Sequence, residues 1–245
     1  MNIKEKIVLA LDVETIEEAQ KLVDELYEYV GTFKVGLQLF CGYGLEIVNY
    51  ILSKNSNFFL DVKLHDIPNT VQKASENVIL RGANFFNVHC TGGIEMMKAA
   101  RKGADVAADK LGKKHPIILG VTMLTSISQE VLDNEFKVDK NVSDFAIRLA
   151  RLAKEAGLDG VVASPLEVEN IKKELGNDFK VLCPGIRPKW SLTNDQKRIA
   201  TPYEAIKRGA DYIVLGRAVT KAENPKEAMM KIYDEIKEGE LCQQH

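Results

Sequence analysis

Charged side chains gather in one short segment, Asp61-Val-Lys63-Leu-His-Asp66, which closes an apolar run. Asp61 and Lys63 stand at positions i and i+2, so in a β-strand both side chains point to the same face. Opposite charges on a face with little water are costly unless they pair with each other. We therefore expect an ion pair, and an ammonium group held in this way can stabilise an anion and deliver a proton.

Further charged residues stand at the ends of neighbouring apolar runs. Lys34 is placed at the end of the second strand, in the run before Asp61, and can meet Asp61 from the other side. Asp66 follows just beyond the run that contains Lys63. The alternative interpretation is a solvated salt bridge, usually worth ~1 kcal/mol or less. The recurrence of charge at adjacent strand ends favours a catalytic site instead, with Lys34, Asp61, Lys63 and Asp66 as its catalytic residues.

Asp12 ends the first apolar run and has two interpretations. It could cap the helix that follows, but Thr15 with Glu18 already forms a capping-box pattern. Asp12 is then free to bind substrate hydroxyls, and we expect that role.

A phosphate-binding pattern stands near the end of the chain. Gly216-Arg217 follows the last apolar run, where a glycine allows close backbone approach and a guanidinium offers a fork for phosphate oxygens. The long irregular stretch before it contains Arg187 and Gln196, which we expect in the same neighbourhood. The Gly-Arg pair alone is a weak signal, and its position after the eighth run strengthens it.

Two patterns alternate along the whole chain and would position these residues. Short apolar runs predict strands buried on both faces, at Ile7–Val13, Phe33–Phe40, Phe58–Leu64, Phe85–Cys90, Ile117–Leu124, Gly160–Ala163, Lys180–Cys183 and Tyr212–Leu215. Amphipathic stretches predict helices after them, at Ile16–Val30, Leu45–Lys54, Val71–Arg81, Ile94–Leu111, Val142–Ala156, Val168–Leu175, Tyr203–Lys207 and Lys226–Lys237.

Strand–helix alternation implies right-handed crossovers and a parallel sheet, and eight repeats favour a closed (β/α)8 TIM barrel. Glycines just past three of the helices, Gly82, Gly157 and Gly209, support the period. We expect residues 1–245 to form one domain, with Leu241–His245 as a frayed tail. In such a barrel the chemistry lies at the carboxyl ends of the strands, which is where the charged residues stand.

Composition excludes several classes of function. With 33 basic and 35 acidic residues the net charge is −2, which predicts no nucleic-acid partner and no binding to an anionic membrane. The four scattered cysteines and the lack of an apolar stretch of ~18 residues predict a reduced, soluble, cytoplasmic protein. No carboxylate or histidine cluster has metal-ligand spacing, so we expect no metal ion.

The chain resembles the bacterial orotidine 5′-phosphate decarboxylases over nearly its whole length. The most specific motif runs from Leu60 to Thr70 and reads LDVKLHDIPNT. Weaker matches are Leu9–Asp12, Phe33–Gly36, Val121–Ser126, Pro184–Pro188 and Leu215–Ala218. The resemblance implies that the protein removes CO₂ from orotidine 5′-phosphate to give UMP, without a cofactor.

The same resemblance implies a role for each matching residue. Lys63 would protonate C6 of the pyrimidine, and Asp61 would lie beside the departing carboxylate. Asp66, Ile67 and Thr70 would reach the partner's site, which implies a homodimer. The remaining substrate-binding residues would be Asp12 and Lys34 at the ribose, Thr125 at the pyrimidine edge, and Arg187, Gln196, Gly216 and Arg217 toward the 5′-phosphate.

The two alternative functions are those of a metal-dependent relative and of an inactive barrel. Sugar-phosphate lyases and β-keto acid decarboxylases of the same suprafamily share the D-x-K-x-x-D segment but use Mg²⁺, with a carboxylate where this chain has Lys34. Lysine there argues against a metal ion. A catalytically inactive barrel acting as a scaffold would be expected to lack some of the charged strand-end residues, and all of them are present.

Overall fold

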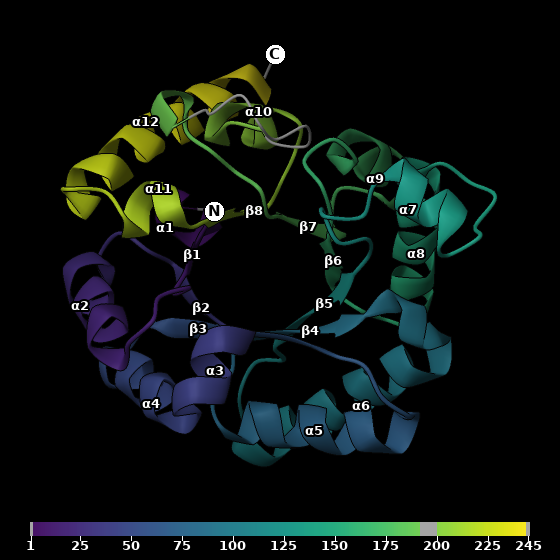
Figure 1. Cartoon of the computed structure of the whole chain (residues 1–245). Helices are drawn as coiled ribbons and strands as arrows, with labels where there is room; N and C mark the ends of the chain where they lie inside the picture. The colour runs from purple at the N-terminus through teal and green to yellow at the C-terminus, as the bar shows by residue number, and fades with distance from the viewer. Residues whose placement is uncertain (1, 192–199, 244–245) are drawn as a thin grey trace.

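Eight parallel strands, each paired with the next along the chain, close into a barrel when β8 pairs with β1. The structure is a computed structural model that describes residues 2–191 and 200–243. Figure 1 looks into the ring of strands, with the larger helices outside it. The strands are β1 (Ile7–Ala10), β2 (Thr32–Gly36), β3 (Asn57–Leu64), β4 (Phe85–His89), β5 (Ile117–Val121), β6 (Gly160–Val162), β7 (Lys180–Cys183) and β8 (Tyr212–Leu215).

Helices fill the connections between successive strands, as the alternating pattern predicts, and others precede β1 and follow β8. They are α1 (Ile3–Lys6), α2 (Ile16–Leu26), α3 (Leu37–Tyr43), α4 (Leu45–Ser53), α5 (Pro68–Leu80), α6 (Gly93–Leu111), α7 (Gln129–Asn134), α8 (Val142–Glu155), α9 (Val168–Leu175), α10 (Pro202–Lys207), α11 (Arg217–Thr220) and α12 (Pro225–Gln243), with short 3-10 turns at Cys90–Gly92 and Lys189–Ser191. The prediction of a (β/α)8 TIM barrel is confirmed. Among the described helices, none has both the length and the apolarity to cross a membrane.

The core has two parts. The larger one lies between the strands and the surrounding helices, where continuous apolar runs bury the outward faces of the strands. The smaller one fills the barrel interior with Val8, Phe59, Phe85, Leu119, Leu182 and Tyr212. The ring of Phe85 meets the ring of Tyr212 edge-on, with centroids 5.3 Å apart. The barrel is therefore filled, and this inner layer forms a floor beneath the carboxyl ends of the strands.

Glycine ends three of the helices in the way the sequence predicts. Gly82, Gly157 and Gly209 have φ angles of 92°, 81° and 100°. Residues with a Cβ atom rarely adopt this left-handed conformation, so glycine lets the chain turn from the helix into the next strand.

Some predicted boundaries are wrong. The second apolar run is strand only to Gly36, and α3 begins at Leu37 within it, because an unbroken apolar run does not distinguish strand from buried helix. The first and fifth runs also leave the sheet early, at Ala10 and Val121. Four short helices (α1, α3, α7 and α11) were not predicted, since a helix of one or two turns shows too little periodicity. Helix α12 continues to Gln243, so the predicted frayed tail is helical as far as that residue.

Candidate active site

A cavity of about 960 Å³ opens at the carboxyl ends of the strands, above the floor of Phe59 and Leu182. Its polar lining includes most of the residues that the sequence singles out. These are Asp12, Lys34, Asp61, Lys63, Thr125, Arg187, Gly216 and Arg217. They come from the ends of β1, β2 and β3 and from the loops after β5, β7 and β8, so the fold brings together segments far apart in the sequence.

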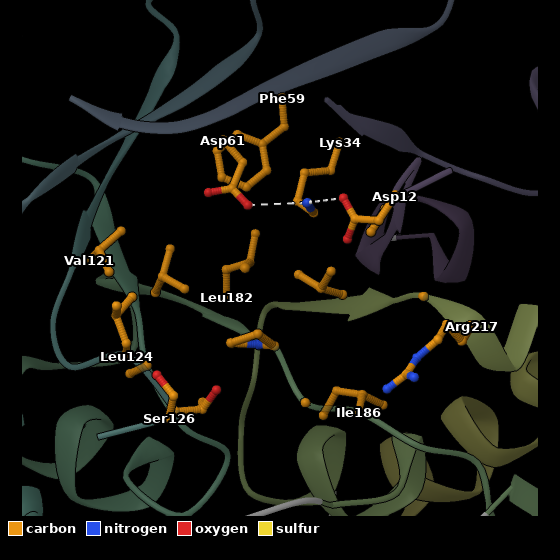
Figure 2. Close-up of a pocket in the computed structure, with 18 of the residues that line it drawn as sticks. Asp12, Lys34, Phe59, Asp61, Val121, Leu124, Ser126, Leu182, Ile186 and Arg217 are labelled. Carbon is orange, nitrogen blue, oxygen red and sulfur yellow. Dashed lines mark hydrogen bonds and ion pairs between the residues drawn. The ribbon is translucent and has the colours of Figure 1, made fainter. Parts of the chain in front are cut away.

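Lys34 stands at the centre of the charged wall. Its Nζ atom lies 3.1 Å from Oδ1 of Asp12 and 3.2 Å from Oδ2 of Asp61, and its side chain is only 9% exposed. Figure 2 shows the ammonium between the two carboxylates. Gly36 keeps this space open, because a Cβ atom there would lie 3.0 Å from both Asp12 Oδ1 and Lys34 Nζ. The expected contact between Lys34 and Asp61 is therefore present, as an ion pair.

The expected ion pair between Asp61 and Lys63 is also present, but the backbone geometry that allows it is not that of a regular strand. Nζ of Lys63 lies 2.7 Å from Oδ1 of Asp61. The two do not share a face of a regular strand, because the pairing of β3 with β4 shifts between Leu60 and Leu64. Lys63 lies in that irregularity with a φ of 53°. This left-handed conformation costs a residue with a Cβ atom roughly 1–2 kcal/mol, and such strain is typical of functional sites.

Asn87 on β4 contacts this irregular segment, and it is not among the site residues that the sequence predicts. Its Nδ2 donates to Oδ1 of Asp61 at 2.7 Å, and its Oδ1 accepts from the backbone N–H of Lys63 at 2.8 Å. Asn87 is 1% exposed. A signal was available, because an amide inside the apolar run Phe85–His89 needs hydrogen-bond partners when it is buried.

The charge of Asp61 is set by opposing effects. Burial is the largest and favours the neutral acid, but the ammonium groups of Lys34 and Lys63, with hydrogen bonds from Lys63 and Asn87, outweigh it. Together they hold the pKa of Asp61 below its ordinary value, so the group is a carboxylate at neutral pH. The site therefore keeps an anion beside a cation, with the side chains of Asp61 and Lys63 only 15% and 30% exposed.

Asp12 is free of a capping role, as expected. Thr15 caps α2 by accepting from the N–H of Glu18 at 3.2 Å. The reciprocal bond of the expected capping box is different, because the Glu18 carboxylate accepts from the N–H of Glu14 instead of that of Thr15. Asp12 is left with its ion pair to Lys34, and its side chain is 55% exposed toward the cavity mouth.

The opposite wall carries positive charge. Arg187, after β7, and Arg217, after β8, both line the cavity with Gly216. In Figure 2 the guanidinium of Arg217 lies across the cavity from Asp61. Two guanidinium groups in one wall suit a phosphate. Gln196 was predicted to join them, and it lies outside the described residues.

Asp66, Ile67 and Thr70 do not line this cavity. All three are exposed, and Ile67 is 66% exposed although it is apolar. The Asp66 carboxylate accepts from the N–H of Ile67 at 2.6 Å. Within the described part of the chain, no ion pair joins Asp66 to Lys34 or Lys63, so the charged array of this subunit consists of Asp12, Lys34, Asp61 and Lys63.

Two histidines lie beside this array without lining the cavity. His65 and His89 stack with ring centroids 5.6 Å apart, and Nδ1 of His89 lies 2.7 Å from the hydroxyl of Thr91. Burial, and then the charges of His65 and Lys63, lower the pKa of His89. Among the described residues, no group of three or more His, Cys, Asp or Glu side chains could hold a metal ion.

Comparison with known proteins agrees with this geometry. Residues 5–232 match the family described as orotidine 5′-phosphate decarboxylase / HUMPS. A protein from Syntrophomonas wolfei named orotidine 5′-phosphate decarboxylase is 47% identical, over 97% of this chain and 100% of its own length. One of the same name from Heliobacterium modesticaldum is 44% identical, over 98% of each chain.

Solved structures give the same result. The crystal structure of orotidine 5′-phosphate decarboxylase from Lactobacillus acidophilus has a TM-score of 0.83 and 37% identity, over 94% of this chain and 98% of that chain. The enzyme of the same name from Pyrococcus horikoshii has a TM-score of 0.74 and 30% identity, over 94% and 99%. The chain thus belongs to the orotidine 5′-phosphate decarboxylase / HUMPS family.

Proposed function

We propose that the protein decarboxylates orotidine 5′-phosphate to UMP in de novo pyrimidine biosynthesis, without a metal ion or cofactor. One observation carries the proposal: the partly buried array in which Asp61 lies between the ammonium groups of Lys34 and Lys63, at 3.2 and 2.7 Å. Family membership and the named relatives support it.

The chemical step requires an anion to be stabilised without an electron sink. The bond between C6 and the carboxylate carbon breaks, CO₂ leaves, and the electron pair stays on C6 as a vinyl carbanion. Lys63 lies next to this carbon in the proposal, stabilises the pair electrostatically and then gives its proton to C6. Solvent returns a proton to Lys63. Asp61 faces the substrate carboxylate, and its negative charge repels that group until CO₂ has left.

The rest of the cavity binds the nucleotide. Asp12 and Lys34 hold the ribose hydroxyls, and Thr125 contacts the pyrimidine edge. Arg187, Gln196, Gly216 and Arg217 bind the 5′-phosphate. The position of Arg217 across the cavity from Asp61 supports this division, since phosphate and pyrimidine lie at opposite ends of the substrate (Figure 2). Binding energy from the remote phosphate can then be used at the reacting carbon.

We propose further that the enzyme is a homodimer in which Asp66, Ile67 and Thr70 complete the partner's site. Their exposure supports this, because all three side chains are accessible to a partner chain, and Ile67 is 66% exposed. We also propose that residues 1–245 work as one domain in the cytoplasm. The four cysteines, all unpaired, suit a reducing compartment.

Lys34 supports the metal-independent form of the reaction. Its ammonium lies between Asp12 and Asp61, the two carboxylates that would otherwise be available to a divalent cation. The relatives that use Mg²⁺ have a carboxylate at this position, and lysine replaces the charge of a metal with its own.

The test is direct. The purified protein is incubated with orotidine 5′-phosphate in excess EDTA, and the pyrimidine absorbance is followed. We expect full turnover in EDTA and none from Lys63→Ala protein purified in the same way, which controls for host enzyme. No turnover by the wild type, or turnover that depends on added Mg²⁺, would contradict the proposal.

A further inference from the structure

The strand pair β3–β4 has an uneven stretch at the active site. Leu60 pairs with Phe86, and the next pair is Leu64 with Val88. Three residues of β3, Asp61 to Lys63, therefore stand opposite the single residue Asn87 of β4. A regular ladder would satisfy their backbone groups with backbone partners, and here it is interrupted.

The side chain of Asn87 replaces part of that ladder. Its carbonyl accepts from the backbone N–H of Lys63 at 2.8 Å, and its amino group donates to Asp61 at 2.7 Å. The two partners fix the orientation of the amide, because an N–H can only donate and a carboxylate can only accept. One buried side chain thus ties the backbone of Lys63 to the carboxylate of Asp61.

We propose that Asn87 is a positioning residue for the decarboxylation: it holds Lys63 in its left-handed backbone conformation and turns Asp61 toward the reacting carbon. The inference rests on the proposed function, since it concerns the same site. Asn87 does not line the cavity and touches no substrate atom in the proposal. It acts through Asp61 and Lys63, and a side chain of another shape or with no donor cannot serve both.

The first test separates positioning from binding. Asn87→Ala removes both hydrogen bonds and leaves the substrate-binding residues of the cavity in place. We expect kcat to fall on the order of 100-fold, since small misplacement of reacting groups has effects of this size, while KM changes less than about twofold. Competent sites are counted by calorimetric titration with UMP, so that unfolded protein does not lower kcat. An unchanged kcat per competent site would overturn the inference, and so would a loss confined to KM.

The second test uses an isosteric change. Asn87→Asp keeps an acceptor for the N–H of Lys63 but sets a second carboxyl group against Asp61. Two adjacent carboxyl groups share one proton, so the variant has its donor only when it is protonated. The ratio of variant to wild-type kcat should then fall as pH rises, by up to about tenfold per pH unit above the pKa of the new pair. A ratio that does not change with pH would contradict the positioning role.

Asn84 provides a matched control at the other end of the same strand pair. Its Oδ1 accepts from the backbone N–H of Phe58 at 3.2 Å, and Asn84→Asp keeps that acceptor. We expect this variant to have the kcat of the wild type, and the ratio of the two kcat values should not change with pH. If one of the two Asn87 variants does not fold, the other variant alone is enough to test the positioning role. Wild-type protein without turnover would refute the proposed function, whereas an active wild type with unaffected Asn87 variants would refute this inference alone.

Discussion

The ammonium of Lys63 lies 2.7 Å from the carboxylate of Asp61, although only one residue separates them and the backbone of Lys63 has left the regular strand with a φ of 53°. In a regular strand a residue two positions along points the same way as its neighbour but stands further up the barrel wall. The irregular backbone instead lets the ammonium reach back to its partner at the cavity. The strain at Lys63 and the ion pair thus belong to one arrangement, which the surrounding structure maintains.

Lys63→Met should abolish most of the activity. Methionine keeps an unbranched side chain but has no proton to give and no charge to stabilise the carbanion. General acid catalysis and electrostatic stabilisation each contribute about 10²-fold or more, so we expect kcat to fall by at least ~10⁴-fold. Steady-state kinetics with orotidine 5′-phosphate measures this. Lys73→Met on α5, which removes an exposed ion pair with Glu76, is the control and should keep wild-type kinetics.

The sequence predicts the barrel because burial gives every repeat the same pattern of an apolar strand followed by an amphipathic helix. It predicts that Lys34, Asp61 and Lys63 lie together because the carboxyl ends of the strands meet at one face of the barrel. It does not predict how Lys63 reaches Asp61. Alternation assumes a regular ladder, and the interruption lies opposite Asn87, more than twenty positions further along the chain. The sequence marks Asn87 as a buried amide that needs partners, but it does not show which groups those partners are, so the link to Lys63 and Asp61 emerges only from the fold.

The residue at which a strand ends and a helix begins is equally hard to predict. The run Phe33–Phe40 is apolar throughout, yet it changes from strand to helix at Leu37. Gly36 marks the change, and its lack of a side chain also makes room for Asp12 and Lys34. A sequence pattern shows the glycine but not the ammonium that occupies the space beside it.

Gly36→Ala should weaken substrate binding with little effect on folding. The added Cβ would lie 3.0 Å from both Asp12 Oδ1 and Lys34 Nζ, so the ion pair must shift. Because these groups hold the ribose in the proposed function, we expect KM to rise several-fold. Gly42→Ala on α3 is the matched control, since nothing lies within 4 Å of its added Cβ. Equal KM values for the two variants and the wild type would contradict the ribose role of the pair.

Arg217→Met should weaken the binding of ligands that carry the 5′-phosphate and leave the binding of ligands without it unchanged. A charge-assisted hydrogen bond contributes about 1.5–3 kcal/mol, which corresponds to a loss of roughly 10- to 150-fold in affinity for UMP. Uridine lacks the phosphate and should bind the variant and the wild type equally. Calorimetry with both ligands measures the difference. An equal loss for uridine and UMP would mean that Arg217 supports the cavity without binding phosphate.

His89 should make stability depend on pH in a definite direction. Its pKa is lowered from the ordinary 6.5, first by burial and then by the charges of His65 and Lys63. The unfolded chain therefore takes up this proton first as pH falls, and the folded state loses stability from about pH 6.5 down to the lowered pKa. His89→Gln removes this loss. Urea unfolding between pH 5 and 8 should show the wild type losing stability relative to the variant as pH falls, and parallel curves would contradict the prediction.

The proposed sharing of residues between subunits predicts complementation of two inactive proteins. Lys63→Ala and Asp66→Ala should each be inactive alone. In a mixed dimer, one site receives Lys63 from one chain and Asp66 from the other and is intact. Random exchange of equal amounts makes half the dimers mixed, so we expect about a quarter of wild-type activity after mixing.

A second mixture separates shared sites from general stabilisation by dimer formation. Lys63→Ala mixed with Asp61→Ala should stay inactive, because both residues belong to the same subunit's array and each site of a mixed dimer lacks one of them. Mass spectrometry of the intact dimers shows whether exchange has taken place. If exchange is complete and the Lys63→Ala and Asp66→Ala mixture stays inactive, Asp66 serves the site of its own chain. Recovery in both mixtures would mean that contact with a partner, and not the donation of Asp66, restores activity.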